Sequence, residues 1–170
     1  MKLVEDYVIK ANEYINEYGK KTVLLMQVGS FYEIYSPNNN NNQLFNIIYD
    51  ISEITGLAVV EKSICVGKEK LLASGFRDYS LDKWLSKIQS NGYTCVVYSQ
   101  DSNCKNTSRS LTGIYTPGTY IQSDNEYSKK NNNNTCIWIE KIRNKIYVGI
   151  SNIDIISGKS NLYEYNTEYR

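Results

Sequence analysis

Apolar side chains recur at intervals of three and four residues in three segments of the chain, with Asn, Glu, Lys and other polar residues between them. This period is typical of amphipathic helices that bury one face. The three segments are residues 3–18, 44–55 and 79–91. A glycine follows each segment, at Gly19, Gly56 and Gly92, as expected at a helix C-terminus. Asp78 or Ser80 is the expected N-cap of the third helix.

Short apolar runs lie between and after these helices and predict strands. They occupy residues 21–28, 57–60, 63–67, 70–75, 93–100 and 111–116. Gly29 and Ser30 break or bend the first strand, and residues 31–36 are expected to continue as extended chain. Beyond residue 135 the pattern predicts further strands, joined by turns at Arg143–Asn144 and at Ser157–Gly158.

The order of these elements predicts the α/β (α+β) class, with a mixed β-sheet flanked by about three helices in residues 1–119. An Asn-rich linker is expected at residues 120–135, and residues 136–170 begin a second, β-rich domain. The two Asn runs, at 38–42 and 131–134, are expected to be solvated and without ordered structure. A chain of 170 residues is long enough to bury a sizeable core.

Composition narrows the possible functions. Lys and Arg number 19 against 18 Asp and Glu, so no global basic field directs the chain to nucleic acid. The chain has no histidine, which removes the usual general base and the commonest zinc ligand. None of its four cysteines forms a C-x-x-C pair, and Cys95 lies in an apolar run that predicts a buried thiol. Because neither a signal peptide nor a membrane span is recognisable, we expect a soluble, intracellular, reduced protein.

No group of residues typical of catalysis or of metal binding stands out, so we assign no catalytic residue and no metal ligand. Residues 158–160, Gly-Lys-Ser, resemble the end of a phosphate-binding loop, but residue 153 is Ile where that loop needs Gly, and a strand-like segment follows. We expect a hairpin turn there. The acidic residues that could form a hydrolytic pair lie in different predicted elements: Glu33, Glu61, Asp78 and Asp82.

One aromatic ring and one carboxylate lie close together after the Gly29–Ser30 bend. Strand alternation places Phe31 and Glu33 on one face, together with Tyr35. Because most Phe side chains are buried, residue statistics favour core packing for Phe31. The alternative is a ring and an acid displayed together, beside a bend where a ligand or another backbone can approach closely.

Basic residues are scattered between positions 60 and 110. They are Lys62, Lys68, Lys70, Arg77, Lys83, Lys87 and Arg109. For any one of them a solvated surface position is the expected interpretation. As a set near the loops of an α/β sheet, they could also contact phosphates and so add salt-dependent affinity for nucleic acid.

Four stretches in order resemble the MutS family of DNA mismatch repair proteins. LLMQVGSFYEIYS, residues 24–36, is similar to the start of the family's mismatch-recognition domain, where an apolar strand precedes Met-Gly-Asp-Phe-Tyr-Glu. The other three are LLASGFRDYSLDKWLSKIQSNGYTCVVYSQ at 71–100, GIYTPGT at 113–119 and YVGISNIDIISGKSNLYEY at 147–165. The last of these resembles the first hairpin of the family's connector domain.

This sequence departs from the family pattern at several positions. Ser30 replaces Asp, Val28 replaces Met, Arg77 stands where Pro is usual, Ser99 stands where Glu precedes Gln100, and Gly113 stands where a basic residue often precedes Thr-Pro-Gly. The Phe-x-Glu motif itself is intact. The departures indicate a divergent branch of the family, such as those of large DNA viruses or organelles.

The resemblance implies that Phe31 stacks from the minor groove on a mispaired or unpaired base and that Glu33 hydrogen-bonds the same base. Stacking on a base is worth about 1–3 kcal/mol whatever the base. The cost of inserting a wedge falls where pairing is already defective, and a carboxylate near phosphates penalises intact duplex. Glu33 would bond a base N–H, or a purine nitrogen if itself protonated. Ser30, Lys62, Arg77 and Arg109 complete the predicted DNA-binding set.

The resemblance also implies a larger protein. Residues 1–119 would be the mismatch-recognition domain, residues 120–135 a linker, and residues 136–170 the start of an RNase H-like connector domain. The family protein is a dimer, and each of its subunits ends in an ABC-type ATPase domain that binds ATP and Mg. That domain does not fit in 170 residues. We therefore interpret the chain as an N-terminal fragment that is not itself an enzyme and holds no cofactor.

The expected partners are double-stranded DNA with a mismatch or small loop, a second copy in a full-length homodimer, and a MutL-like protein. The sequence does not distinguish a nuclear, organellar, virus-associated or bacterial cytoplasmic location. One alternative is a non-catalytic structural or protein-interaction domain of a MutS relative that has lost mismatch specificity. Another, a small-molecule enzyme, is disfavoured because the His, metal and phosphate-binding motifs are missing.

Overall fold

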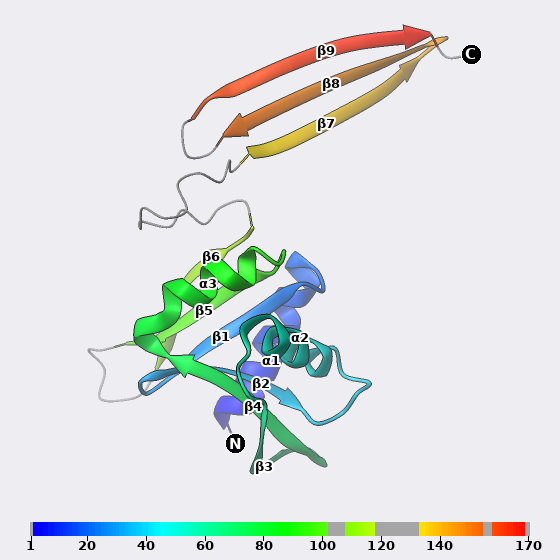
Figure 1. Cartoon of the computed structure of the whole chain (residues 1–170). Helices are drawn as coiled ribbons and strands as arrows, with labels where there is room; N and C mark the ends of the chain where they lie inside the picture. The colour runs from blue at the N-terminus through cyan, green and yellow to red at the C-terminus, as the bar shows by residue number, and fades with distance from the viewer. Residues whose placement is uncertain (1, 102–107, 118–132, 155–157, 169–170) are drawn as a thin grey trace. The chain divides into compact units, whose positions relative to one another are not determined.

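The strands and helices separate into two units along the chain. The computed structural model describes residues 2–101, 108–117, 133–154 and 158–168 (Figure 1). The first unit spans residues 1–117 and the second residues 118–170. The first contains the three helices and a six-stranded sheet, and the second contains a three-stranded sheet. The predicted mixed α/β class is therefore confirmed.

The three helices lie close to the predicted ranges. They are α1 at Lys2–Tyr18, α2 at Gln43–Thr55 and α3 at Leu81–Gln89, the last preceded by a 3₁₀ turn, η1, at Asp78–Ser80. Ser80, one of the two predicted residues, is the N-cap residue of α3, but no side chain makes a capping hydrogen bond there. The Asp78 carboxylate accepts the amide of Tyr79 inside the 3₁₀ turn, and the Ser80 hydroxyl donates to the Arg77 carbonyl, so neither side chain caps α3.

Six strands form the sheet of the first unit, in the order β3-β4-β2-β1-β5-β6 (Figure 1). Their bounds are β1 Thr22–Val28, β2 Phe31–Pro37, β3 Val60–Val66, β4 Glu69–Arg77, β5 Thr94–Gln100 and β6 Arg109–Tyr115. Strands β1 and β5 pair in parallel, and the other neighbouring strands of this sheet pair antiparallel. Of the strand predicted at 57–60, only Val60 belongs to a strand.

The Gly29–Ser30 pair is a hairpin turn, so the predicted break and the predicted extended residues 31–36 are both found, and the chain reverses direction between the two strands. Val28 pairs directly with Phe31, and β2 runs antiparallel to β1. Gly29 has φ +60°, whereas Ser30 does not have positive φ. Glycine at the first central position is what a type II′ hairpin turn requires, and such turns match the twist of the flanking strands.

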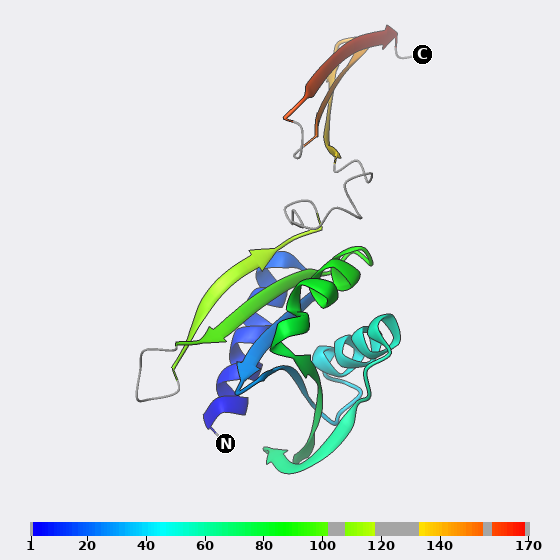
Figure 2. The ribbon, with the colours of Figure 1, turned by 60° about the vertical axis from the view of Figure 1, so that its left-hand side comes forward.

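Helices cover both faces of the sheet (Figures 1 and 2). Helix α1 packs on the face that carries Tyr35, where the Tyr7 ring meets the Tyr35 ring edge-on at 5.1 Å and the Tyr7 hydroxyl donates to the Leu24 carbonyl. Helix α3 packs on the opposite face, where the Trp84 ring lies 5.9 Å from that of Phe76, and α2 lies beside α3. The fully buried side chains between these layers include Val23, Leu25, Met26, Ile34, Ile48, Ile51, Leu85, Ile88, Val96 and Val97.

The first Asn run is ordered, contrary to expectation. The amide of Asn38 donates to the Lys70 carbonyl, and the amide of Asn42 donates to the carbonyl of Asn39. The Asn42 side chain accepts the amide of Leu44 and so caps α2. Asn is a favoured N-cap because its short side chain reaches an otherwise unpaired helix amide. The last residue of the run is therefore a helix cap, which the composition of the run did not indicate.

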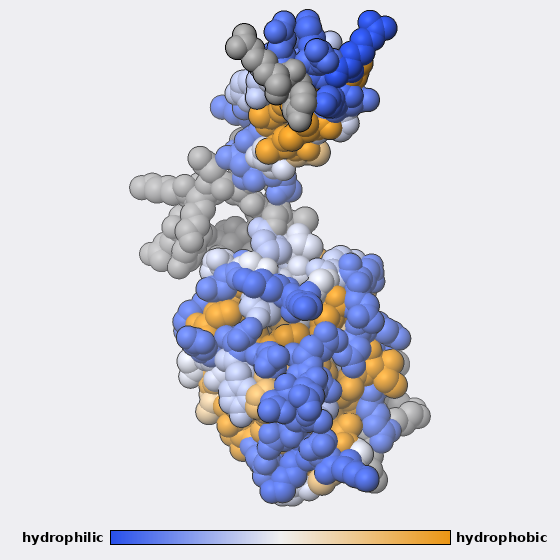
Figure 3. Space-filling model, turned by 90° about the vertical axis from the view of Figure 1, so that its right-hand side faces the viewer, coloured by the Kyte–Doolittle hydropathy of each residue, from blue (hydrophilic) through white to orange (hydrophobic). Residues whose placement is uncertain are grey.

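The second unit is an antiparallel sheet of three strands, β7 Asn133–Ile142, β8 Lys145–Asp154 and β9 Ser160–Glu168, in that order. Residues 118–132, most of the predicted linker, lie outside the described residues, and β7 takes in its last three residues. The predicted turn at Arg143–Asn144 is confirmed, with Arg143 at φ +56°. Apolar side chains gather on the face of this sheet visible in Figure 3, among strands that are largely exposed.

The Gly-Lys-Ser stretch at 158–160 lies between two antiparallel strands, as expected for a turn. The Gly158 amide donates to the Asp154 carbonyl at 2.8 Å, and the Asp154 amide donates to the Lys159 carbonyl at 2.9 Å. Residues 155–157 lie outside the described residues. A phosphate-binding loop would open a helix, whereas here β9 follows.

Candidate nucleic-acid interface

The Phe31 ring is displayed rather than buried. Phe31 is the first residue of β2, directly after the two-residue turn, and 40% of it is exposed. The next residue, Tyr32, points to the opposite face, where its ring lies 6.0 Å from that of Phe76 and its hydroxyl bonds the Ser99 hydroxyl at 2.8 Å. The turn and the alternation of the strand thus hold a large apolar ring at the edge of the core, with part of its surface in water.

Glu33 lies two residues further along β2, on the same face as Phe31. One of its carboxylate oxygens, Oε2, accepts the hydroxyl proton of Tyr35. The other, Oε1, lies 3.8 Å from Lys62 Nζ, which is an ion-pair separation but too long for a hydrogen bond. Oε1 is therefore the oxygen that an incoming donor can reach. The Glu33 side chain is 21% exposed.

Tyr35 fixes the orientation of the Glu33 carboxylate. Its ring is buried against Tyr7, and burial together with the bond to Glu33 raises the pKa of its hydroxyl well above the usual value near 10. The hydroxyl therefore keeps its proton at neutral pH and acts as a donor to the carboxylate. A neutral donor of this kind engages Oε2, while Oε1 faces the Lys62 ammonium.

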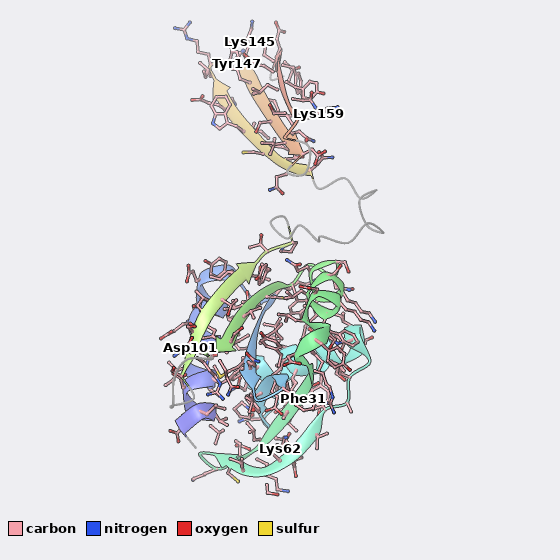
Figure 4. The ribbon with its side chains drawn as sticks, turned by 90° about the vertical axis from the view of Figure 1, so that its left-hand side faces the viewer. Phe31, Lys62, Asp101, Lys145, Tyr147 and Lys159 are labelled. Carbon is pink, nitrogen blue, oxygen red and sulfur yellow. The ribbon has the colours of Figure 1, made fainter. Side chains whose placement is uncertain are left out.

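Strand β4 brings small residues beside Glu33. Gly75 pairs with Glu33, and Ala73 pairs with Tyr35. A Cβ added to Gly75 would lie 2.6 Å from the Tyr32 carbonyl oxygen and 3.2 Å from Glu33 Cγ. The missing side chain at position 75 therefore provides the space in which Glu33 lies. Lys62 lies on β3, on the far side of β4 from Glu33, and its ammonium reaches the carboxylate across this strand. Figure 4 labels Lys62 and Phe31 in the first unit.

Arg77 is the register partner of Phe31 on β4. Its guanidinium carbon lies over the Phe31 ring, 5.2 Å from the ring centroid. A guanidinium at this separation from an aromatic face makes a cation–π contact. The backbone beside it is held in place, because the Asp78 amide donates to the Ser30 carbonyl at 3.0 Å. Phe31, Ser30 and Arg77 thus form one cluster at the end of the hairpin.

Arg109 is the first residue of β6, and it contacts β1 of the same hairpin close to the turn. Its Nε donates to the carbonyl of Gln27 at 2.5 Å, and its charge is close enough to Tyr35 to act on the hydroxyl. The Gln27 side chain accepts the amide of Gln100 and so ties β1 to β5. The guanidinium of Arg109 therefore has a backbone partner, and it adds positive charge to the site while bracing the strand before the turn.

The structure thus brings together the six residues predicted as a DNA-binding set. Phe31, Glu33, Ser30 and Arg77 lie within the hairpin and its β4 neighbour, Lys62 reaches in from β3, and Arg109 lies behind the hairpin on β6. Two contributors were not predicted. Tyr35 orients the carboxylate, and Gly75 makes room for it. A glycine inside a strand pattern is a signal of close approach by neighbouring backbone, and it could have indicated Gly75.

Two searches of the described residues bear on other kinds of site. Among the residues that the structure describes, no group of three or more His, Cys, Asp or Glu is placed to hold a metal ion. Within the same residues, no helix combines the length and the apolar character needed to span a bilayer.

Residues 8–124 match the model of the MutS domain I family, and the chain belongs to that family. The match covers the whole six-stranded sheet and most of α1. The predicted family is therefore confirmed.

Individual relatives extend the similarity to most of the chain. A MutS homolog from Acanthamoeba polyphaga mimivirus, described as a DNA mismatch repair protein, is 28% identical over 165 residues, which is 94% of this chain and 15% of that protein. The DNA mismatch repair protein MutS of Fusobacterium nucleatum is 29% identical over 168 residues, 95% of this chain and 17% of that protein. A mitochondrial DNA mismatch repair MutS homolog of Sarcophyton glaucum is 26% identical over 136 residues, 68% of this chain and 14% of that protein. The chain thus spans less than a fifth of the length of these relatives.

Proposed function

We propose that the first unit binds double-stranded DNA at a mispaired or unpaired base, in the service of DNA mismatch repair. The observation that carries the proposal is the exposed Phe31 ring at the start of β2, with the partly exposed Glu33 carboxylate on the same face and only one of its oxygens bonded by Tyr35. The family to which the chain belongs, and relatives that are named as DNA mismatch repair proteins, support it.

Phe31 acts as the wedge. A flat apolar ring that is held at a hairpin end can enter between base steps from the minor groove and stack on one base. Unstacking costs a few kcal/mol at an intact step and less at a mismatch or bulge, where pairing is already lost. The ring therefore selects defective sites through the ease with which they deform, and it needs no contact to a particular base edge.

Glu33 acts as a discriminator. Its Oε1 can accept a hydrogen bond from a base N–H that an unstacked or mispaired base presents, while Tyr35 keeps the other oxygen engaged. At intact duplex no such donor is offered, and the carboxylate faces the phosphates across a short distance. The resulting repulsion lowers affinity for correctly paired DNA, and this penalty on the wrong target sharpens the preference.

The basic side chains supply affinity for the backbone. Lys62 lies beside Glu33 and is exposed enough to meet phosphate oxygens, and Arg77 adds a positive charge beside Phe31. Such contacts position a protein on the duplex, and their contribution falls as the salt concentration rises. Ser30, exposed at the hairpin turn, adds a hydroxyl within the same footprint. We assign the chain a binding role without chemistry of its own.

We extend the proposal to the full-length protein only in outline. By analogy with the relatives' family, it would act as a homodimer in which one Phe31 is inserted at a time, with ATP hydrolysis and a MutL-like partner outside this chain. Nothing in the hairpin cluster requires a nucleotide. The experiment below tests only the recognition of a mispaired or unpaired base.

The test compares binding of the full-length protein to a duplex with a G·T mismatch or a single-base bulge and to the matched duplex, at one fixed salt concentration. Phe31→Ala should lower affinity for the defective duplex about tenfold or more and bring the preference close to one, with weak nonspecific binding left. Tyr49→Ala is the matched control, because Tyr49 is 44% exposed on α2, away from the hairpin.

Two outcomes would contradict the proposal in different ways. An unchanged preference in Phe31→Ala would exclude stacking by this ring. A wild-type protein that binds both duplexes equally would favour the alternative, in which the domain keeps the family fold as a structural or protein-interaction unit.

A further inference from the structure

A second planar group lies on the wedge. Arg77 pairs with Phe31 across the β2–β4 ladder, so both side chains project from the same face at the same level of the sheet. The Arg77 guanidinium lies over the ring, 5.2 Å from its centroid. A phenyl ring has two faces, and this contact occupies one of them. A base that stacks on Phe31 would then use the other face.

The charge of Arg77 has no carboxylate partner in the part of the chain that the structure describes. Three lysines of this unit do have such a partner: Lys10 with Asp6, Lys62 with Glu33, and Lys70 with Glu61. The nearest acid in the chain, Asp78, uses its carboxylate to accept the Tyr79 amide. The Arg77 guanidinium is thus held by the ring alone, on an exposed residue whose backbone is extended, with φ −69° and ψ 143°.

A guanidinium held in this way suits the DNA minor groove. It is planar, weakly hydrated and carries five N–H donors, and it keeps its charge at any accessible pH. The minor groove presents purine N3 and pyrimidine O2 acceptors in every base pair, within a negative potential that attracts arginine. A ring that enters the groove to stack on a base carries the guanidinium on its other face into that potential.

Resting on the proposed function, we propose that Phe31 and Arg77 act as one two-layer wedge, in which the ring stacks on the defective base and the guanidinium donates to the minor-groove acceptors of the adjacent base pair. Arg77 is then a specificity residue, because its contacts form only where the ring is inserted. An arginine that only touched phosphate would instead strengthen binding to every duplex equally.

The test is a double-mutant cycle on the full-length protein. Wild type, Phe31→Ala, Arg77→Ala and the double variant are measured on bulged and matched duplexes at one salt concentration. Arg77→Ala should weaken bulge binding about tenfold in the wild-type background. The same change should cost less than about twofold on matched duplex, and also on the bulge once Phe31 is Ala. This loss of additivity is the signature of one unit.

Two further variants separate charge from stacking. Arg77→Lys keeps the positive charge but lacks the planar guanidinium. It should therefore lose most of the affinity for bulged duplex that Arg77→Ala loses. Lys83→Ala is the matched control, since Lys83 also lies over an aromatic ring, that of Trp84 at 4.8 Å, but on α3 at the opposite face of the sheet. It should leave the bulge-to-matched ratio unchanged. Because Arg77 and Lys83 are both exposed, the melting temperatures of these variants should equal that of wild type.

The outcomes distinguish a failure of the two-layer wedge from a failure of the proposed function on which it rests. An equal loss on both duplexes, with the slope of log K against log salt reduced by about one, would make Arg77 a phosphate contact and overturn the two-layer wedge. So would additive effects, no effect, or tighter binding in Arg77→Ala. If Phe31→Ala abolishes the preference in these cases, the proposed function stands. If Phe31→Ala leaves the preference for bulged duplex unchanged, the proposed function and the two-layer wedge are both wrong.

Discussion

Glu33 and Gly75 face each other across the β2–β4 ladder, and the glycine leaves just enough space for the carboxylate-bearing side chain. A methyl group at position 75 would come within 3.2 Å of Glu33 Cγ and 2.6 Å of the Tyr32 carbonyl oxygen. The second separation is shorter than real Cβ contacts, and its partner is backbone, which cannot turn aside. The position of the carboxylate therefore depends on a residue on the neighbouring strand that has no side chain.

Gly75→Ala is expected to lower the free energy of unfolding by about 1–3 kcal/mol, because the added methyl group must displace strand backbone. The displacement should also move Glu33 and reduce discrimination between bulged and matched duplex. Urea denaturation measures the first effect and the ratio of the two dissociation constants the second. Gly67→Ala, at a turn with open space around the glycine but φ +62°, separates backbone strain from crowding. Retention of wild-type stability and discrimination in Gly75→Ala would disprove the packing argument.

Glu33→Gln should narrow the preference for bulged over matched duplex by strengthening matched binding. The substitution removes the negative charge that repels the phosphates, while an amide oxygen can still accept a base N–H. Equilibrium titration of both duplexes checks the direction. Glu61→Gln is a suitable control, because Glu61 is likewise paired with a lysine, Lys70, but lies away from Phe31. A uniform loss of affinity on all DNA would contradict the assigned role of the carboxylate.

Lys62→Gln is expected to weaken matched-duplex binding by about threefold or more and to weaken bulge binding less, so that the preference rises. The change leaves the Glu33 charge without its ion-pair partner and removes one potential phosphate contact. Stability should fall by less than about 1 kcal/mol, since the pair is exposed to solvent. Titrations at several salt concentrations test this, with Lys70→Gln as the comparison. A preference that falls in Lys62→Gln alone would refute it.

The free energy of unfolding should decrease as pH rises above about 10. Burial raises the pKa of the Tyr7 hydroxyl, and burial with hydrogen bonding does the same for Tyr93 and Tyr98. Above the ordinary tyrosine pKa near 10 the unfolded chain loses protons that the folded chain retains, so the unfolded state is favoured by about 1.4 kcal/mol per pH unit for each such group. Below that pH the contribution is fully present.

Urea denaturation at pH 8 and at pH 10.5 measures this dependence. Tyr7→Phe should make the alkaline decline less steep, because it removes one of the groups that titrates only in the unfolded chain. Tyr79→Phe, at a residue that is 83% exposed, should leave the slope as in wild type. An identical slope in wild type and Tyr7→Phe would show that the Tyr7 hydroxyl does not contribute.

The helices and the family could be predicted from the sequence, because both depend on local sequence signals. The apolar period of 3.6 residues and a following glycine specify α1, α2 and α3 to within a few residues. The start of α3 was not specified in this way. Asp78 and Ser80 are both good N-cap residues; Ser80 takes the position, but in the 3₁₀ turn after β4 both side chains bond other backbone groups and neither makes a capping bond.

The exposure of Phe31 could not be predicted from its own residue type, which favours burial. It follows from the hairpin, since a ring directly after a two-residue turn projects beyond the strand ends where no helix covers it. A signal for that hairpin was present. Gly-Ser between two strand-like runs is a typical two-residue turn, but the continuous apolar pattern concealed the reversal.

The partners of Glu33 depend on strand order. Lys62 is 29 residues from Glu33 along the chain, and it reaches the carboxylate because β3 lies next to β4 and β4 next to β2. No periodicity in the sequence encodes that order. The contact between Arg77 and Phe31 likewise requires the register of the β2–β4 ladder, which a single sequence does not state.

The two-residue turn at Gly29–Ser30 places a limit on how this protein can vary. Because strand side chains alternate, one inserted residue in the turn would exchange the two faces of β2. Tyr32 and Ile34 would then lie on the face that now carries Phe31 and Glu33, and the ring and the acid would turn to the face packed by Phe76 and Trp84. Homologues that recognise DNA in this way should therefore differ freely in the loop before α2 but not in the length of this turn.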